Sequence, residues 1–190
     1  MITEIPSADD FKQSGIAFLN LAWDSAAQLH FQFEDAKEGY WYENEDAFEK
    51  EVPDQYWAAA QRPLATAVTL VQQGLEFLLK GRIAEVSPFF LISRSPAEWP
   101  KGCTSSDTRF ADFKTIDAQD LVRVHDTVAS AKLSEEIVKK FEFLRRQRNT
   151  IMHTVDREVR FTAFDIFRDV LVVSHELEQF LILCVRIPAV

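Results

Sequence analysis

Hydrophobic residues recur along most of the chain at intervals of three and four positions, a spacing that lines one face of an α-helix. This pattern predicts helices over residues 7–33, 54–86, 117–129, 133–153 and 161–185. Pro63 is expected to break or kink the second of these helices. The alternation that is typical of half-buried strands is almost absent. The sequence therefore predicts an all-α fold, an antiparallel bundle of four to five long helices.

Polar residues mark where two of the predicted helices begin. Ser7 and Asp10 have the spacing of a capping box, in which each side chain accepts a hydrogen bond from the other residue's backbone N–H. Ser134 precedes Glu135 and Glu136, and acidic residues favour the positive end of a helix. We therefore expect helix N-termini directly after Ser7 and Ser134.

Two stretches lack the helical pattern. Residues 34–54 are polar and acidic, and we expect a loop there with at most one short helix. Residues 93–116 are rich in Pro, Gly, Ser and Asp and predict a long loop insertion. The chain contains no internal repeat, and its 190 residues suit one hydrophobic core. The sequence thus predicts a single domain over residues 1–190.

The apolar segments are interrupted by charge and are shorter than the roughly 18 residues that a membrane-spanning helix needs. The N-terminus does not have the basic-then-apolar pattern of a signal peptide. Cys103 and Cys184 are far apart and have no Cys-x-x-Cys spacing, so we expect reduced thiols. Together these features predict a cytoplasmic protein that does not enter a membrane.

The net charge of −9 argues against general binding of nucleic acid, but the charge is uneven. Residues 139–160 contain seven basic and three acidic residues, a net charge of +4. One basic segment in an acidic chain suits the local capture of an anion better than the coating of a long polyanion. A solvated helix face is the other interpretation of the same segment.

Several kinds of chemistry lack their sequence signals. The four histidines show neither the His-Glu-x-x-His pattern of zinc helices nor the Glu-x-x-His pattern of di-iron bundles. The sequence contains no Gly-rich phosphate loop and no Gly-x-Ser-x-Gly elbow. We therefore expect no metal ion and no cofactor.

The stretch "LRRQRNTIMH" combines Arg148, Asn149 and His153. An imidazole can accept and donate a proton near neutral pH, and a guanidinium can hold a phosphate through two parallel hydrogen bonds. Arg148 and His153 lie about 140° apart around an ideal helix, whereas Asn149 and His153 share a face. We expect Asn149 to orient the imidazole and Arg148 to reach the site from its flank. A second copy of the chain could supply the missing half of the site.

These residues suit cleavage of RNA, whose own 2′-hydroxyl is the nucleophile, without a metal ion. "LRRQRNTIMH" resembles the signature of the HEPN superfamily, an Arg followed after four to six residues by a His, with a polar residue commonly directly after the Arg. "LVQQGLEFLLKGRIAEVSP" is similar to the second long helix of larger bacterial members. "LSEEIVKKFEFLRRQRNTIMHTVDREV" resembles their motif helix and the turn after it. The resemblance extends over the whole chain, and residues 93–116 are its least typical part.

The resemblance implies a homodimer with the motif helix at its interface and a metal-independent endoribonuclease activity. Such enzymes leave 2′,3′-cyclic phosphate and 5′-hydroxyl ends on tRNA or mRNA. Many serve in toxin–antitoxin, anti-phage or stress systems, so an antitoxin or another partner protein is a further expectation. Other members have lost catalysis, and the alternative prediction is a dimer that binds RNA or a partner protein as a regulatory module.

Other basic residues near the motif extend the candidate site. Arg145, Arg146 and Arg157 are expected to attract phosphate without taking part in the chemistry. Arg168 and His175 match the same signature with a longer spacer and, at seven residues apart, share a helix face. The polar Asn149 and the preceding basic run favour the first pair, so Arg168 and His175 are the second choice.

Overall fold

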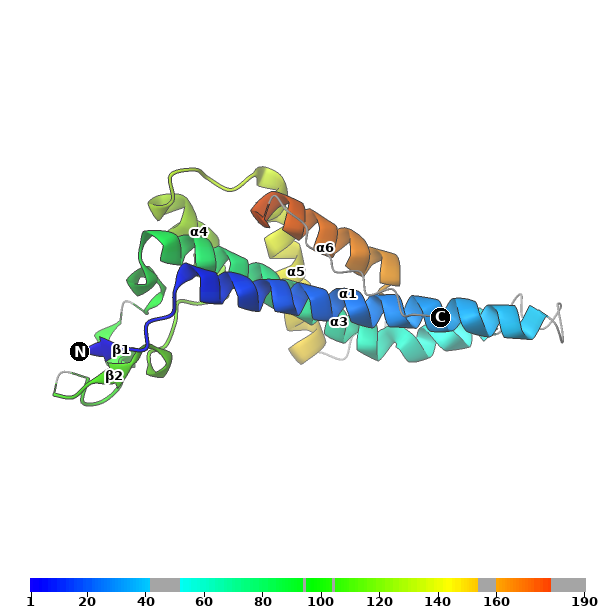
Figure 1. Cartoon of the computed structure of the whole chain (residues 1–190), viewed down its shortest axis with the longest axis horizontal. Helices are drawn as coiled ribbons and strands as arrows, with labels where there is room; N and C mark the ends of the chain where they lie inside the picture. The colour runs from blue at the N-terminus through cyan, green and yellow to red at the C-terminus, as the bar shows by residue number, and fades with distance from the viewer. Residues whose placement is uncertain (42–51, 94, 104, 154–159, 179–190) are drawn as a thin grey trace. The chain divides into compact units, whose positions relative to one another are not determined.

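The computed structural model describes residues 1–41, 52–93, 95–103, 105–153 and 160–178. These residues form five α-helices (Figure 1): α1 (Ala8–Trp41), α3 (Val52–Val86), α4 (Ala118–Val128), α5 (Glu135–His153) and α6 (Ala163–Glu178). The predicted all-α fold is confirmed. Within the described ranges, no helix is both long and apolar enough to cross a membrane.

The predicted loop insertion contains only short elements. It holds two 3₁₀ helices, η2 (Pro96–Glu98) and η3 (Phe110–Asp112), and the strand β2 (Thr108–Arg109). Strand β2 pairs in parallel with β1 (Ile2–Thr3) near the N-terminus. A further 3₁₀ helix, η1 (Pro88–Leu91), follows the end of α3. The prediction of a long loop is therefore confirmed, although short 3₁₀ helices and a short strand interrupt the loop.

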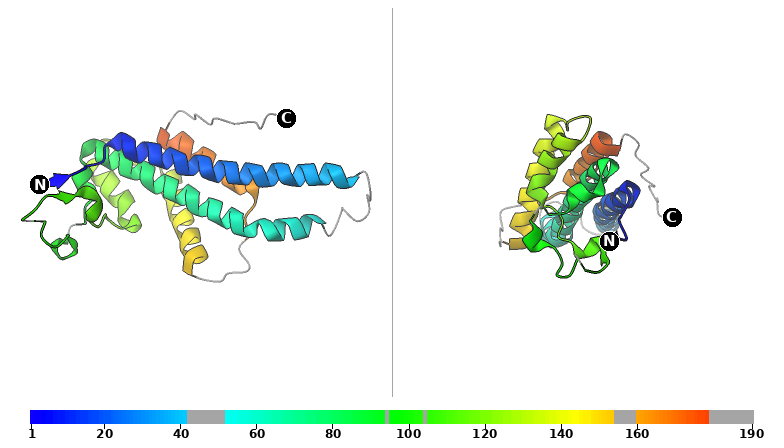
Figure 2. Two further views of the ribbon diagram at one scale, coloured as in Figure 1. Left: turned by 60° about the horizontal axis from the view of Figure 1, so that its bottom comes forward. Right: turned by 90° about the vertical axis from the view of Figure 1, so that its left-hand side faces the viewer.

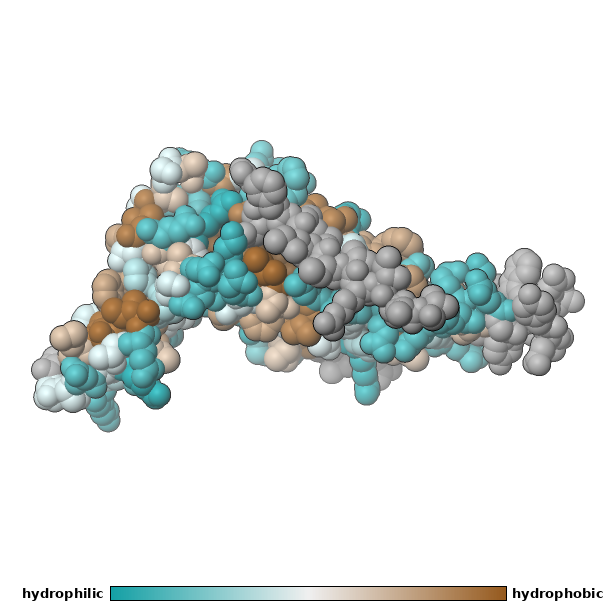
Figure 3. Space-filling view, in the orientation of Figure 1, coloured by the Kyte–Doolittle hydropathy of each residue, from teal (hydrophilic) through white to brown (hydrophobic). Residues whose placement is uncertain are grey.

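Helix α1 is longer than predicted, because it continues past residue 33 to Trp41. Residues 34–41 were expected to belong to a loop, and the described structure corrects this. The segment is polar yet contains Glu, Ala and Lys, which favour helix formation. Lys37 and Glu34 form an ion pair of 3.9 Å across one turn. Figure 3 shows hydrophilic residues over this part of α1, where Asp35 and Glu38 are exposed.

Helix α3 runs without interruption through Pro63, which does not break it. A proline inside a helix removes one backbone hydrogen bond and crowds the preceding turn. Burial of the neighbouring Ala60, Leu64 and Ala67 stabilises the turns on both sides of the proline. The apolar stripe of α3 therefore outweighs the local preference of one residue.

The caps that the sequence predicts are present. The Ser7 Oγ accepts a hydrogen bond of 3.1 Å from the Asp10 N–H, and the Asp10 carboxylate accepts one of 2.8 Å from the Ser7 N–H. The hydrogen bonds that the Ser7 hydroxyl and the Ser7 N–H donate to the Asp10 carboxylate lower its pKa. The Ser134 Oγ accepts a hydrogen bond of 3.2 Å from the Ile137 N–H in the first turn of α5. The prediction of both helix starts is confirmed.

Contacts within the chain divide it into two compact units. Unit 1 consists of Met1–Ala17 and Gln73–Arg145, and unit 2 consists of Phe18–Gln72 and Arg146–Val190. Helices α1, α3 and α5 each contribute residues to both units. The prediction of a single domain over residues 1–190 stays a prediction.

In unit 1, the start of α1 lies beside the end of α3, as both views in Figure 2 show. Gly15 on α1 makes this close approach possible. A Cβ atom built on Gly15 would lie 2.9 Å from Cγ of Leu78 and 3.0 Å from the carbonyl oxygen of Gly74. Phe11 and Phe77 pack beside this crossing with ring centroids 6.1 Å apart.

Unit 1 also contains a buried histidine, His125, on the last turns of α4. Its Nδ1 lies 2.9 Å from the Asp126 carboxylate, which also accepts a hydrogen bond of 3.0 Å from the Leu133 N–H. Partial burial raises the pKa of Asp126, but the hydrogen bonds from Leu133 and His125 outweigh burial and hold the pKa below its usual value. Asp126 thereby joins the end of α4 to the turn that leads into α5.

In unit 2, aromatic side chains join α1 to α6 and to the start of α3. Trp23 packs on Phe167 with ring centroids 4.6 Å apart, and His30 lies edge-on to Phe164 at 5.3 Å. The Tyr56 hydroxyl on α3 donates a hydrogen bond of 2.6 Å to the Leu29 carbonyl. The apolar core of this unit comes from Ala22, Ala26, Leu64, Val68, Val71, Ala163, Ile166, Val170 and Val173.

Replacing Gly15 by Ala tests the close crossing of α1 and α3. We expect the overpacking cost of about 1–3 kcal/mol to exceed the gain of about 1 kcal/mol from better helix propensity. Urea denaturation should therefore give Gly15→Ala a lower free energy of unfolding than the wild type. Gln13→Ala, on the exposed face of the same helix, is the control and should change stability by less than about 0.5 kcal/mol. A more stable Gly15→Ala protein would contradict the crossing.

Replacing Asp126 by Ala tests the junction between α4 and α5. A lowered pKa in the folded state means that the carboxylate stabilises the fold above its usual pKa of 3.8 and loses this effect as the pH falls further. We expect Asp126→Ala to lower the free energy of unfolding by about 1–3 kcal/mol at neutral pH, because the Leu133 N–H loses its partner.

The difference between Asp126→Ala and the wild type should shrink as the pH is lowered from 6 to 3, as urea denaturation at each pH would measure. Asp112→Ala is the control, since Asp112 is exposed and pairs with Arg109 on the surface. A difference that is the same at pH 6 and pH 3 would show that the charge of Asp126 is irrelevant.

Candidate functional site

The residues of the predicted motif lie at the C-terminal end of α5, in the part of this helix that belongs to unit 2. Arg148 and Asn149 are half-buried, and His153 is the exposed last residue of the helix. Met152, directly before it, is 58% exposed although it is apolar. The helix thus ends in an imidazole that solvent can reach, beside an uncovered apolar side chain.

Arg148 and Asn149 contact each other, because the Arg148 Nη1 donates a hydrogen bond of 3.3 Å to the Asn149 Oδ1. We expected Asn149 to orient the His153 imidazole. Within the described residues, no hydrogen bond joins these two side chains. In a single chain, the Asn149 side chain therefore contacts the Arg148 guanidinium instead of the imidazole. Only one of the five N–H donors of Arg148 is used in this contact.

Arg148 also differs from its neighbours in its electrostatic surroundings. Arg145, which belongs to unit 1, forms an ion pair of 2.8 Å with Glu142, and only 26% of its side chain is exposed. Over the part of the chain that the structure describes, no carboxylate pairs with Arg148. Because a guanidinium is always charged, the donors of Arg148 that no described residue uses suit an anion.

The other predicted phosphate-binding residues contribute unequally. Arg146 is exposed on α5. Arg145 is engaged by Glu142, which weakens its attraction for a phosphate. Arg157 lies outside the described residues. The structure therefore brings Arg148 together with Asn149 but does not place all the predicted residues around one point.

The second-choice pair, Arg168 and His175, lies on the exposed side of α6. Arg168 forms an ion pair of 2.8 Å with Asp165, and its Nε lies 3.7 Å from Asp169. His175 is 84% exposed, with its Nδ1 3.6 Å from the Glu176 carboxylate. Two carboxylates beside Arg168 neutralise its charge, so this pair is less suited to hold a phosphate than Arg148.

Two interactions position the start of α6, and the sequence analysis missed both. The Gln61 side chain on α3 accepts a hydrogen bond of 2.8 Å from the Phe161 N–H and donates one of 3.1 Å to the Phe161 carbonyl. Thr162 and Asp165 form a second capping box, in which each backbone N–H donates 3.1 Å to the other side chain. The Thr-x-x-Asp spacing is a sequence signal for the cap. No local signal exists for Gln61, whose partner is 100 residues away.

The capping box also sets the charge state of Asp165. Partial burial raises its pKa, but hydrogen bonds from Thr162 and the charge of Arg168 outweigh burial and lower the pKa. Asp165 therefore stays ionised and continues to pair with Arg168.

Within the described ranges, no group of three or more His, Cys, Asp or Glu side chains could hold a metal ion.

Comparison of the chain with known proteins finds no significant match. No protein-family model, no curated protein and no solved structure is significantly similar to the chain. Support for the candidate site therefore comes from the geometry of its own residues and from the signature in the sequence.

Replacing Gln61 by Met tests the contact that positions α6. Met preserves the length of the side chain but leaves the Phe161 N–H and carbonyl without their partner. We expect a loss of about 1–3 kcal/mol in the free energy of unfolding, measured by urea denaturation. Thr66→Ala on the same helix, whose exposed hydroxyl donates a hydrogen bond of 3.1 Å to the Arg62 carbonyl, is the control and should cost far less. A Gln61→Met protein as stable as this control would contradict the role of Gln61.

Proposed function

We propose that the chain is a HEPN-type endoribonuclease that cleaves RNA without a metal ion. The observation that carries the proposal is Arg148, a half-buried guanidinium without a carboxylate partner among the described residues, five positions before an exposed imidazole on the same helix. In a chain with a net charge of −9, an uncompensated guanidinium is suited to receive a phosphate. The Arg-Asn…His signature supports the same assignment.

The reaction requires two proton transfers and the neutralisation of one charge. The 2′-oxygen of the RNA attacks the adjacent phosphorus and loses its proton to a base. The bond from phosphorus to the 5′-oxygen breaks, and that oxygen takes a proton from an acid. The products are a 2′,3′-cyclic phosphate and a 5′-hydroxyl. Arg148 binds the non-bridging phosphate oxygens, where negative charge grows in the transition state.

His153 supplies the proton transfers in this proposal. One imidazole can act as the base, and a second is needed at the same time as the acid. A homodimer with its two-fold axis near the end of α5 provides both, one from each subunit. Asn149 contributes by holding the Arg148 guanidinium through its Oδ1.

The proposal extends to the biological setting that the signature implies. The enzyme would act in the cytoplasm on RNA of the tRNA or mRNA class, as a toxin or as a component of a defence or stress system. An antitoxin or another partner protein would then control it. A cleavage assay on purified RNA tests the chemistry without knowledge of these partners.

The second candidate function is a non-catalytic dimer that binds RNA or a partner protein. One specific observation favours it: in the described part of a single chain, no hydrogen bond joins His153 to Arg148 or Asn149. If no second copy completes the site, the basic end of α5 could still bind phosphate groups. This function predicts that RNA is bound and stays intact.

Replacing His153 or Arg148 by Ala tests the proposed catalysis. Purified protein is incubated with total tRNA or mRNA in EDTA, and the cleavage rate and the chemistry of the new ends are measured. We expect His153→Ala to lower the rate by about 10²–10⁴-fold because proton transfer is lost. Arg148→Ala should lower it by about 10²–10³-fold because charge on the phosphate is no longer neutralised.

Two matched variants act as controls for the same side-chain losses. His175→Ala and Arg168→Ala remove the second-choice pair and should leave the cleavage rate within about twofold of the wild type. Circular dichroism and size-exclusion chromatography establish that each variant is folded and show its oligomeric state. If His153→Ala and Arg148→Ala cut RNA as the wild type does, the proposed function is wrong. RNA that is bound but not cut by the wild type would favour the binding module.

A further inference from the structure

The proposed cleavage of RNA leaves its two imidazoles in exchanged protonation states. The base that takes the proton of the 2′-hydroxyl ends as an imidazolium, and the acid that protonates the 5′-oxygen ends as a neutral imidazole. Hydrolysis of the cyclic phosphate product needs these same two states, with the roles of the two groups reversed. A second reaction can therefore follow directly, provided that a water molecule takes the place of the departed strand.

Water can reach the imidazole that this second reaction uses. His153 is the last residue of α5, and its side chain is exposed. In the proposed dimer the site must stay open to RNA, so water can enter by the same route. Enzymes that protect a reactive intermediate from hydrolysis enclose it and expel water. An imidazole at an exposed helix end gives the cyclic phosphate no such protection.

Arg148 and Asn149 suit the retention of the cyclic phosphate after the first step. The Arg148 guanidinium is half-buried, and its Nη1 donates a hydrogen bond of 3.3 Å to the Asn149 Oδ1. A cyclic phosphate diester keeps one negative charge, and a guanidinium can bind its two non-bridging oxygens in parallel. The strand that ends in a 5′-hydroxyl has no phosphate at that end, so Arg148 favours the retention of the cyclic phosphate over that of the leaving strand.

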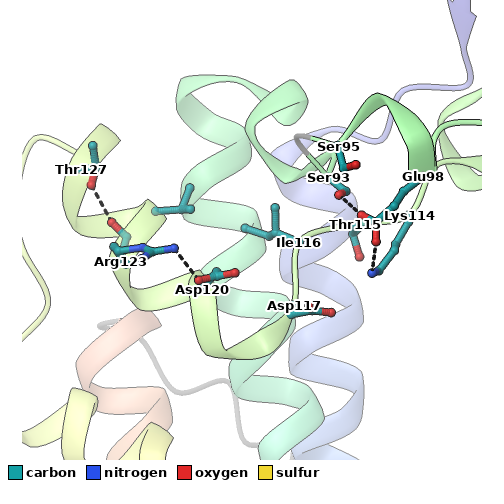
Figure 4. Close-up of a pocket in the computed structure, with 11 residues that line it drawn as sticks. Ser93, Ser95, Glu98, Lys114, Thr115, Ile116, Asp117, Asp120, Arg123 and Thr127 are labelled. Carbon is teal, nitrogen blue, oxygen red and sulfur yellow. Dashed lines mark hydrogen bonds and ion pairs between the residues drawn. The ribbon is translucent and has the colours of Figure 1, made fainter.

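A hollow of about 410 Å³ in unit 1 is less suited to hold the phosphate (Figure 4). Lys114 and Arg123 are the basic side chains among its described lining residues. Lys114 contacts Glu98 at 2.7 Å, and Arg123 contacts Asp120 at 2.6 Å. These carboxylates compete with a phosphate for the same N–H donors. We therefore expect the cyclic phosphate to bind at Arg148.

We propose that the same site also hydrolyses 2′,3′-cyclic phosphates to 3′-phosphates. The neutral imidazole takes a proton from water, and the water oxygen forms a bond to phosphorus. The bond from phosphorus to the 2′-oxygen breaks, and this oxygen takes the proton of the imidazolium. The product is a 3′-phosphate with a free 2′-hydroxyl, and both imidazoles return to their starting states. This second activity rests on the proposed function, because it uses the same His153 and Arg148 side chains.

Cytidine 2′,3′-cyclic phosphate is a substrate that tests the second reaction apart from the cleavage of RNA. It is incubated with the full chain in EDTA at neutral pH, and ³¹P NMR follows the loss of the cyclic phosphate and the growth of its products. We expect slower turnover than for RNA, because a mononucleotide lacks the contacts that neighbouring nucleotides supply. The product should be the 3′-phosphate alone, because the 2′-oxygen is the leaving group. A mixture of 2′- and 3′-phosphates would contradict hydrolysis at this site.

The variants that test RNA cleavage also test the hydrolysis. We expect His153→Ala to lower its rate by about 10²–10⁴-fold, because both proton transfers are lost. Arg148→Ala should lower it by about 10²–10³-fold, because the charge on the phosphate is no longer neutralised. His175→Ala on α6 and Arg123→Ala at the hollow of unit 1 remove the same kinds of side chain elsewhere and should stay within about twofold of the wild type.

The two substrates distinguish a failure of the second activity from a failure of the proposed function. If the wild type cleaves RNA but leaves the cyclic phosphate intact, the second activity is wrong and the proposed function stands. If neither substrate is consumed, both are wrong. Hydrolysis that persists unchanged in His153→Ala and Arg148→Ala would come from another site or from a contaminating phosphodiesterase and would also overturn the second activity.

Discussion

The close approach of α1 to α3 is the constraint on which the rest of the structure depends. Both helices contribute residues to both units. In unit 1, Gly15 meets Leu78 and the backbone of Gly74 with no space for a side chain. In unit 2, the same two helices hold α6, through the Trp23–Phe167 contact with α1 and through Gln61 of α3. Small residues at the crossing let the helix backbones approach closely.

The candidate site at the end of α5 is a place where a charge has no opposite charge beside it among the described residues. Several described arginines pair with a nearby acid, as Arg145 does with Glu142 and Arg168 with Asp165. Arg148 has an amide as its neighbour instead, which leaves its charge available to an anion. Because an uncompensated charge gains more from a ligand than a paired one, Arg148 is informative.

Local sequence signals predicted the helices well where the apolar stripe was continuous. The start of α5 after Ser134 and the capping box of Ser7 and Asp10 followed from polar residues at fixed spacing, because a cap involves neighbours only. The end of α1 and the effect of Pro63 were predicted less well. Both depend on a balance between local preference and the burial of the same helix elsewhere, which a short window of sequence does not contain.

The sequence by itself determined the all-α class, the order of the helices and the position of Arg148, Asn149 and His153 at the end of α5, because periodicity and helix geometry are local properties. Only the tertiary structure decided which side chains meet. Gln61 reaches a backbone 100 residues away. Contacts between residues that are far apart in the sequence depend on how the elements pack. A single sequence does not reveal which of these residues come close together in space.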